Sequence, residues 1–307
     1  MSAQPDPKQA LTGLIAAELA QPVAQAARDM AEAVRRRHGS AIAVLFYGSC
    51  LRQPETQLAD SLLDFYLLVD DYKAAYNSAW LALANRLLPP NVFYLEIPFG
   101  TGKLRTKYAV ISLAQFRRGT SSAAANVSLW ARFSQPARLI WHRDQTTAAA
   151  VADACAEAVL TMLGAIRPQL PETENPERLW VAAFQATYRA ELRPEGSDRA
   201  HHIYESDRTR YDRITAAALQ VLRRRNGEGK GKEAGYSWES RRRIGKLLNI
   251  ARLLKAAFTF DGGLDYILWK VKRHSGVSIP VTHWQRRHPV LAAPLLAWRL
   301  YRRGAFR

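Results

Sequence analysis

Cysteine is nearly absent from this sequence, with only Cys50 and Cys155 among 307 residues. Two thiols exclude a disulfide scaffold and a zinc ribbon, which need at least four. Unbroken apolar runs of the roughly 18 residues that span a bilayer are missing as well. Hydrophobic residues still make up 48% of the chain, so a sizeable core can form. We therefore expect a globular intracellular protein of about two domains.

The first 25 residues lack the features of a targeting segment. Their one basic residue, Lys8, stands with Asp6 and Glu18. A secretory signal begins with basic residues, and a mitochondrial presequence is rich in arginine and poor in acids. We expect an unprocessed, cytoplasmic chain.

Acidic residues are scarce only toward the C-terminus. Residues 223–307 hold 20 Lys and Arg against 5 Asp and Glu, and so carry +15 of the formal net charge of +17. Such a basic region predicts an anionic partner, either nucleic acid or a phospholipid surface. No recognition-helix, zinc-finger or RNA-binding signature accompanies it, so we expect no stable nucleic-acid partner.

The hydrophobic pattern predicts an α/β fold followed by helices. Short apolar runs typical of buried strands occur at 41–47, 62–69, 92–97 and 108–112. Helical patterns occupy 8–37 and 73–88, and most of the chain after residue 146. We expect three units: an α/β domain at 1–145, a helical domain at 146–235 and basic amphipathic helices at 236–307.

Polar residues that suit a nucleotide stand at two of the predicted strands. Gly48 and Ser49 follow the first strand, and Asp64 and Asp70 share one face of the second because strand side chains alternate. A Gly-Ser turn offers N–H groups and a hydroxyl to phosphates, and a strand carboxylate can hold Mg²⁺ against them. The alternative is that Asp64 caps a turn and Asp70 ends an ordinary strand.

This arrangement resembles the nucleotidyltransferases of the polymerase-β type. Their pattern is a strand, Gly-Ser, then two carboxylates two residues apart on the next strand, and a third carboxylate on a later strand. Tyr66 occupies the second acidic position here, and Glu96 is the candidate for the third.

Longer segments resemble the mitochondrial-type phosphatidate cytidylyltransferases, also called CDP-diacylglycerol synthases. The segments that carry the likeness are 47–53 (Tyr-Gly-Ser-Cys-Leu-Arg-Gln), 63–71, 92–94, 107–112 (Lys-Tyr-Ala-Val-Ile-Ser), 129–136 and 243–273. In that family the position two after the first Asp is not acidic, so Tyr66 agrees with the pattern. The resemblance implies a polymerase-β-like domain followed by a mainly helical, winged-helix-like domain.

The chain also departs from the family pattern. Residues 75–88 lack its Trp-His…His-Tyr-Ser segment, and Cys50 and Ala109 replace two glycines. We therefore expect a divergent bacterial relative, and the missing segment leaves the lipid acceptor open.

The resemblance implies that CMP is transferred from CTP to phosphatidic acid, giving CDP-diacylglycerol and pyrophosphate with Mg²⁺. Asp64 and Lys107 are the expected catalytic residues, although Lys107 could be only a surface strand lysine. The expected phosphate-binding residues are Tyr47, Gly48, Ser49 and Gln53, and the expected metal ligands are Asp64, Asp70 and Glu96.

The acceptor implies contact with a membrane. Candidate contacts to the lipid phosphate or the membrane are Arg193, Arg252, Lys255, Lys270 and Lys272. Residues 290–303 are apolar and aromatic with a basic end, which suits a helix lying in the membrane interface, although a core-packing helix has the same pattern. We expect a peripheral protein on the inner face of the cell membrane.

Two other functions stay open. The first is a nucleotidyltransferase with a different acceptor, such as another lipid phosphate, a sugar or a nucleic-acid end. The second is a non-catalytic membrane or nucleic-acid adaptor that uses only the basic C-terminal region.

Overall fold

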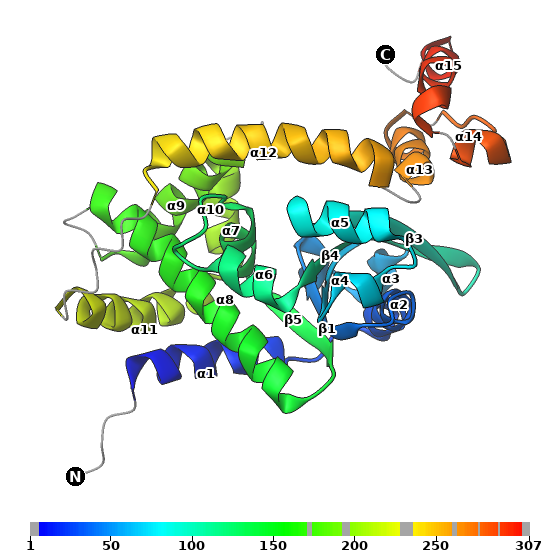
Figure 1. Cartoon of the computed structure of the whole chain (residues 1–307). Coiled ribbons are helices and arrows are strands. Elements are labelled where there is room, and N and C mark those ends of the chain that lie inside the picture. The colour runs from blue at the N-terminus through cyan, green and yellow to red at the C-terminus, as the bar shows by residue number, and fades with distance from the viewer. Residues whose placement is uncertain are drawn as a thin grey trace.

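A computed structural model describes most of the chain as a mixed α/β protein with a five-stranded sheet (Figure 1). The described residues are 6–170, 174–191, 197–227, 236–259, 263–275, 277–287 and 289–302. The strands are β1 (Ala41–Tyr47), β2 (Leu62–Val69), β3 (Asn91–Phe99), β4 (Gly102–Ser112) and β5 (Ala137–His142), in the order β3-β4-β2-β1-β5. Strand β2 pairs parallel with β4, and the other pairs are antiparallel.

The helices up to the last strand surround the sheet and its loops. They are α1 (Pro7–Leu19), α2 (Gln25–Arg36), a 3-10 turn (Ser49–Arg52), α3 (Glu55–Leu58), α4 (Tyr72–Ala75), α5 (Ala79–Leu87), α6 (Leu113–Thr120) and α7 (Ser128–Phe133). The four predicted strands and the helices on either side of Pro22 are confirmed. The sequence prediction missed β5, and the single helix predicted at 73–88 is two helices, because Ser78 caps a new one at Leu81 N–H.

The second half of the described chain is helical. Its helices are α8 (Gln145–Ile166), α9 (Pro176–Glu191), α10 (Ser197–Glu205), α11 (Arg208–Gly227), α12 (Trp238–Thr259), α13 (Gly263–Ser275), α14 (His283–Arg287) and α15 (Pro289–Arg302). The described part of residues 146–235 contains helices and no strand, so the winged-helix expectation is not confirmed.

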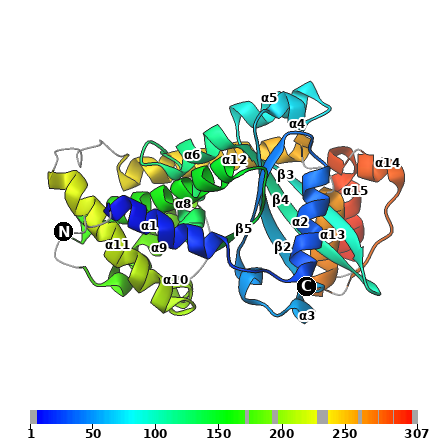
Figure 2. The same cartoon turned by 90° about the horizontal axis from the view of Figure 1, so that it is seen from below.

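Each face of the sheet belongs to its own hydrophobic core. Phe46, Phe65 and Tyr108 lie in the core that α2 covers. Leu45 and Tyr66 point to the other face, where a larger core extends into the helices, including α8 and α9. Figure 2 shows the helical bundle, which consists of α1 and α8 to α11, on one side of the sheet and α2 on the other. Helix α1, predicted as part of the sheet domain, packs on α8 and α11.

Helix α8 gives the sequence its most apolar segment. Among the described residues, Gln145–Gln169 is long and apolar enough in composition to cross a membrane, but 67% of its apolar window is buried in the protein. The segment contains Asp153 and Glu157, which is why the sequence shows no unbroken run. Helix α8 contacts α1, α6, α7, α9 and α11, so its apolar residues form core here.

Helix α12 joins the bundle to the sheet. It runs above both halves in Figure 1 and contacts α9, α5 and β3. At its start the buried Arg241 donates to the Ala124 carbonyl over 2.7 Å and lies over the Trp130 ring. At Gly245 the approach to α9 is so close that a Cβ would lie 2.5 Å from the Ala190 carbonyl oxygen. The predicted basic helix is therefore part of the body of the protein.

A buried ion pair fastens the N-terminal helix to the bundle. The Glu18 carboxylate of α1 pairs with the Arg210 guanidinium of α11, and both side chains are about nine-tenths buried. Arg210 also donates to the Ser134 carbonyl at 3.0 Å.

We predict that Glu18→Gln lowers the free energy of unfolding by about 3 kcal/mol, because it leaves the Arg210 charge buried without its counter-ion. Urea denaturation measures the change. The matched control is Asp153→Asn, which removes the exposed Lys8–Asp153 pair between α1 and α8. It should change stability by less than about 1 kcal/mol. Equal effects of the two substitutions would contradict the prediction.

Candidate active site

One row across the sheet brings together residues from three strands. Tyr47 of β1 is in register with Asp64 of β2, and Asp64 with Lys107 of β4. Residues in register point to the same face of a sheet. The Lys107 Nζ accordingly lies 3.5 Å from the Asp64 Oδ1. The two residues expected to be catalytic are therefore neighbours.

The turn that follows β1 places Gly48 directly beside this row of residues. Its φ is +90°, a region that favours glycine, and a Cβ there would lie 3.3 Å from the Asp64 Oδ2. Ser49 begins the short 3-10 helix after the turn and is exposed. The Gly-Ser turn and the strand carboxylate therefore lie side by side, as the sequence predicts.

Asp64 has an oxygen that lacks a hydrogen bond within the described protein. Its Oδ1 is buried and accepts none, although the Lys107 ammonium is nearby. A carboxylate oxygen in this position is stabilised by a cation.

Gln53 has a structural partner. Its side-chain oxygen accepts a hydrogen bond from the Ser61 hydroxyl at 2.7 Å, which ties the turn after β1 to the start of β2. A contact of Gln53 with a nucleotide stays a prediction.

Asp70 lies far from Asp64. Asp70 comes six positions after Asp64, just beyond the end of β2, which corresponds to about 20 Å along the strand direction. Asp70 pairs instead with the Arg143 guanidinium beyond β5. The prediction that both carboxylates share one metal is therefore wrong, because alternation fixes the face of a strand residue and not its distance along the strand.

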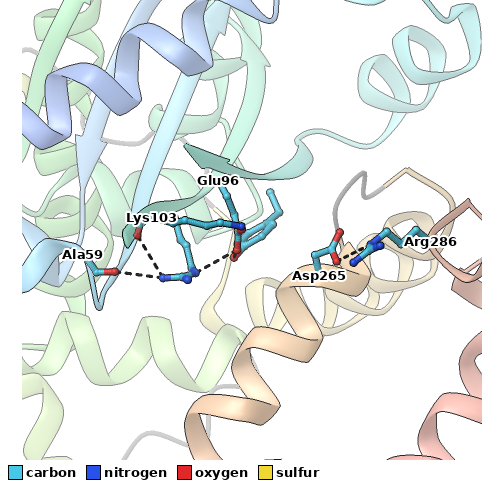
Figure 3. Close-up of polar contacts among 7 residues, drawn as sticks. Ala59, Glu96, Lys103, Asp265 and Arg286 are labelled. Carbon is cyan, nitrogen blue, oxygen red and sulfur yellow. Dashed lines mark hydrogen bonds and ion pairs between the residues drawn. The ribbon is translucent and has the colours of Figure 1, made fainter. Parts of the chain in front are cut away.

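Glu96 also belongs to a different cluster. It accepts hydrogen bonds from the Tyr94 hydroxyl at 2.7 Å, from Lys103 at 2.9 Å and from Arg105 at 3.2 Å (Figure 3). Burial opposes its ionisation, but these partners hold the pKa of Glu96 below its usual value. Two strand spacings, about 10 Å, separate its strand from that of Asp64. Glu96 therefore belongs to an ion-pair cluster of its own, and its role as a third ligand beside Asp64 stays a prediction.

A divalent cation fits this site only in part. No group of three or more His, Cys, Asp or Glu residues within the described ranges is arranged to hold a metal. Asp64 offers a buried carboxylate oxygen without a hydrogen bond at this site, which is the kind of ligand that Mg²⁺ prefers. Mg²⁺ in nucleotide sites is commonly held by one or two carboxylates together with the substrate phosphates. The residues therefore fit a metal that arrives with a nucleotide, and not one held by protein alone.

A cavity of about 540 Å³ opens beside the row, between the sheet, α7, the end of α9 and α12. The charged part of its lining is mostly cationic. The charged residues that line it are Lys107, Arg132, Arg252, Lys255 and Glu191. Four cations against one carboxylate make the cavity suited to an anionic ligand.

Arg132 is a residue that the sequence analysis did not single out. It projects from α7 over the rings of Tyr47 and Tyr66, with its Cζ 5.1 and 5.7 Å from their centroids, and donates to the Tyr66 hydroxyl at 3.0 Å. Burial disfavours its charge, but the neighbouring Tyr47, Tyr66 and Glu191 raise the pKa of Arg132 overall. The motif at 129–136 contains Arg132, yet no sequence pattern shows that so short a helix faces the sheet.

Two basic residues of α12 point inward. Arg252 donates from Nε to the Pro89 carbonyl at 2.9 Å. The Lys255 ammonium donates to the carbonyls of Leu88 and Pro90 at 2.5 and 2.6 Å, and to Asn91 Oδ1 at 3.0 Å. They contact the loop after α5 and the cavity, so they do not belong to an outer membrane-facing surface. Burial and the neighbouring Arg252 lower the pKa of Lys255 to about 8.

The other predicted lipid contacts lie elsewhere. Lys272 is exposed on α13, and Lys270 lies on the same helix. Arg193 lies outside the described residues.

The likeness of this chain to known proteins is found among solved structures. A scan against protein-family models finds no matching family, and a search of curated proteins finds no match. Among solved structures, a nucleotidyltransferase-like protein from Exiguobacterium sibiricum matches with 14% identity over 91% of each chain, at a TM-score of 0.27. A TM-score of this size does not establish a common fold.

We predict that Gly48→Ala lowers the free energy of unfolding by about 1–2 kcal/mol, because alanine at positive φ is strained and its methyl group crowds Asp64. Urea denaturation gives the value. Gly13→Ala in α1 is the control, since nothing lies within 4 Å of its added Cβ. That change should stabilise by about 0.5–1 kcal/mol, and a stabilising Gly48→Ala would refute the assigned turn.

We predict that folding stability depends on the protonation of Lys255. Its pKa of about 8 lies below that of an unfolded lysine, about 10.4, so the unfolded chain binds more protons between these values. The stability of the wild type relative to Lys255→Met should therefore increase as pH rises from about 8 to about 10. Urea denaturation of both proteins across this range isolates the effect, and a decrease with pH would contradict it.

Proposed function

We propose that the protein is a nucleotidyltransferase whose centre is the Asp64–Lys107 pair beneath the Gly48-Ser49 turn. The observation that carries the proposal is the position of this pair at the edge of a cavity with four lining cations. A nucleoside triphosphate supplies the complementary negative charge. The turn suits phosphate binding, since Gly48 has no Cβ and is only partly buried and Ser49 is exposed.

We further propose that CTP is the donor and phosphatidic acid the acceptor. The segments at 47–53, 63–71 and 107–112 support this assignment by their resemblance to phosphatidate cytidylyltransferases. The size and charge of the cavity are consistent with more than one phosphate group. We propose a location peripheral to the inner face of the cell membrane of a bacterium, because a lipid acceptor requires access to the bilayer.

The reaction needs little acid–base help. An oxygen of the lipid phosphate forms a bond to the α-phosphorus of CTP while the bond from that phosphorus to the bridging oxygen breaks, and pyrophosphate leaves. The lipid phosphate is already ionised at neutral pH, so positioning and charge neutralisation supply the catalysis.

Different residues of the site would neutralise charge and hold the metal. Lys107 would neutralise charge on the donor phosphates, and Arg132 would hold further phosphate charge at the cavity wall. Arg252 would neutralise phosphate charge from the opposite wall of the cavity. Asp64 would be the protein ligand of Mg²⁺, which neutralises phosphate charge when bound.

Helix α15 has two apolar faces that bear on membrane association. Ala292, Leu296 and Leu300 pack into a small core with Ile279, as the core-packing alternative requires. Leu291 and Trp298 are more than half exposed on the same helix. Because this face is exposed, we retain the proposal that residues 290–303 lie in the membrane interface.

A different acceptor stays the second candidate. Residues 75–88, where the cytidylyltransferases have a His-containing segment, form the end of α4 and all of α5 here, and α5 presents apolar residues outward. A non-catalytic adaptor would need none of the geometry around Asp64.

We predict that the purified protein releases pyrophosphate from CTP with Mg²⁺ and phosphatidic acid vesicles, and that Asp64→Asn lowers kcat by about 10²-fold or more. Asp70→Asn is the matched control on the same strand, because Asp70 pairs with Arg143 far from the site. It should retain activity, and a fully active Asp64→Asn would remove Asp64 from the mechanism.

The same assay separates the acceptors. Release from CTP that requires phosphatidic acid supports the proposed reaction. Release that requires another phosphorylated lipid, a sugar or a nucleic acid assigns that acceptor instead. No pyrophosphate with any nucleotide and acceptor would leave the adaptor as the surviving function.

A further inference from the structure

Two neighbouring helices present apolar faces to solvent. On α5 these residues are Trp80, Leu83 and Leu87, and on α12 they are Leu247, Ile250 and Leu254. Both sets have the spacing i, i+3, i+7, which places them on one face of a helix. Their relative exposure lies between 49% and 73%, so each helix carries an apolar stripe that the described residues do not cover.

The opposite faces of the same helices are fixed in the protein. Asn85 of α5 is fully buried and donates to the Val110 carbonyl. On α12, Arg241 donates to a backbone carbonyl between α6 and α7, and Arg252 and Lys255 donate to carbonyls of the loop after α5. Neither helix can turn its apolar stripe inward without breaking these contacts, so the stripes face outward.

The two stripes lie next to each other and beside the cavity. Figure 1 shows α5 below the end of α12, and the two helices are in contact. Lys255, adjacent to Leu254, bonds the carbonyl of Leu88, adjacent to Leu87. Ile250 is exposed and also lines the cavity. We call the six residues the α5–α12 surface, and it borders the mouth of the cationic cavity.

Basic side chains accompany this surface. Arg86 on α5 and Arg242 and Lys246 on α12 are exposed. An apolar stripe with flanking cations is the pattern of helices that lie in the interface of an anionic bilayer.

We propose that the α5–α12 surface docks on an anionic phospholipid bilayer and so places lipid headgroups at the cavity mouth. This inference rests on the proposed function for its purpose, because a lipid phosphate held at this mouth needs to travel only into the adjacent cavity. It locates the membrane contact on the catalytic half of the protein and not on α15 alone.

The test measures co-sedimentation of the full chain with vesicles of phosphatidylcholine, with and without phosphatidylglycerol. Wild type should bind the anionic vesicles, and Leu83→Glu and Leu254→Glu should each weaken that binding by about tenfold or more, because each removes a buried leucine from the interface. Gln57→Glu on α3 adds the same charge on the side of the sheet-containing half opposite to α5 (Figure 2). It should leave binding within about twofold, since its charge is screened at that distance.

A second measurement separates this proposal from the proposed function. With a short-chain, water-soluble phosphatidic acid, the two Glu variants should release pyrophosphate as the wild type does, while their turnover on vesicle-embedded phosphatidic acid falls with binding. Failure of the wild type on both acceptors would overturn the proposed function and leave vesicle binding readable.

Three outcomes would overturn the docking surface. The first is binding of both Glu variants at wild-type strength with unchanged urea midpoints. The second is loss of binding only in Leu295→Glu on α15. The third is a wild-type dimer that Leu254→Glu converts to a monomer with vesicle binding unchanged, which would assign the surface to a second copy of this chain. If a Glu variant fails to fold, Leu254→Gln takes its place under the same criteria.

Discussion

The Asp64 carboxylate sits among buried strands, and its negative charge is the constraint to which the rest of the site conforms. A carboxylate oxygen without a hydrogen bond is tolerable only where cations are close. Lys107 on the adjacent strand meets that need directly, and the cations of the cavity wall add to it. The lack of a Cβ at Gly48 lets the turn approach the same carboxylate. The anion and its neighbours thereby form a compact charged centre at the edge of the cavity, and the proposed function places a metal–nucleotide complex there.

The central strands and the choice of Asp64 and Lys107 as candidate site residues could be predicted from sequence because both follow from local patterns, whereas their contact depends on the pairing of β2 with β4. Apolar runs bounded by Gly and Asp give β1 and β2, and the motifs on β1, β2 and β4 select Asp64 and Lys107. The grouping of Asp64 with Asp70 failed because a period of two residues carries no information on distance along a strand. β5 was missed because its residues, Ala137–His142, are mixed in polarity and only partly buried.

The direction of side chains on α12 could not be predicted from its own sequence. Basic residues occur all around this helix, and composition suggests a solvated or membrane-facing surface. The structure turns Arg252 and Lys255 inward because the loop after α5 offers carbonyl oxygens that are close to this helix only in the folded chain. The basic residues of the C-terminal region thus lie in two places: some line the cavity, and others are exposed on the surface.

The glycine at position 245 sets the depth to which these cations reach. A side chain at Gly245 would collide with the Ala190 carbonyl. Because glycine has none, α12 and α9 can approach closely at this point. Arg252 follows Gly245 by seven residues, or about 10 Å of helix. A shift of α12 by one turn, about 5.4 Å, would break the hydrogen bond of the Arg252 guanidinium to the Pro89 carbonyl. The close contact at Gly245 therefore helps to fix the position of the Arg252 charge relative to the sheet.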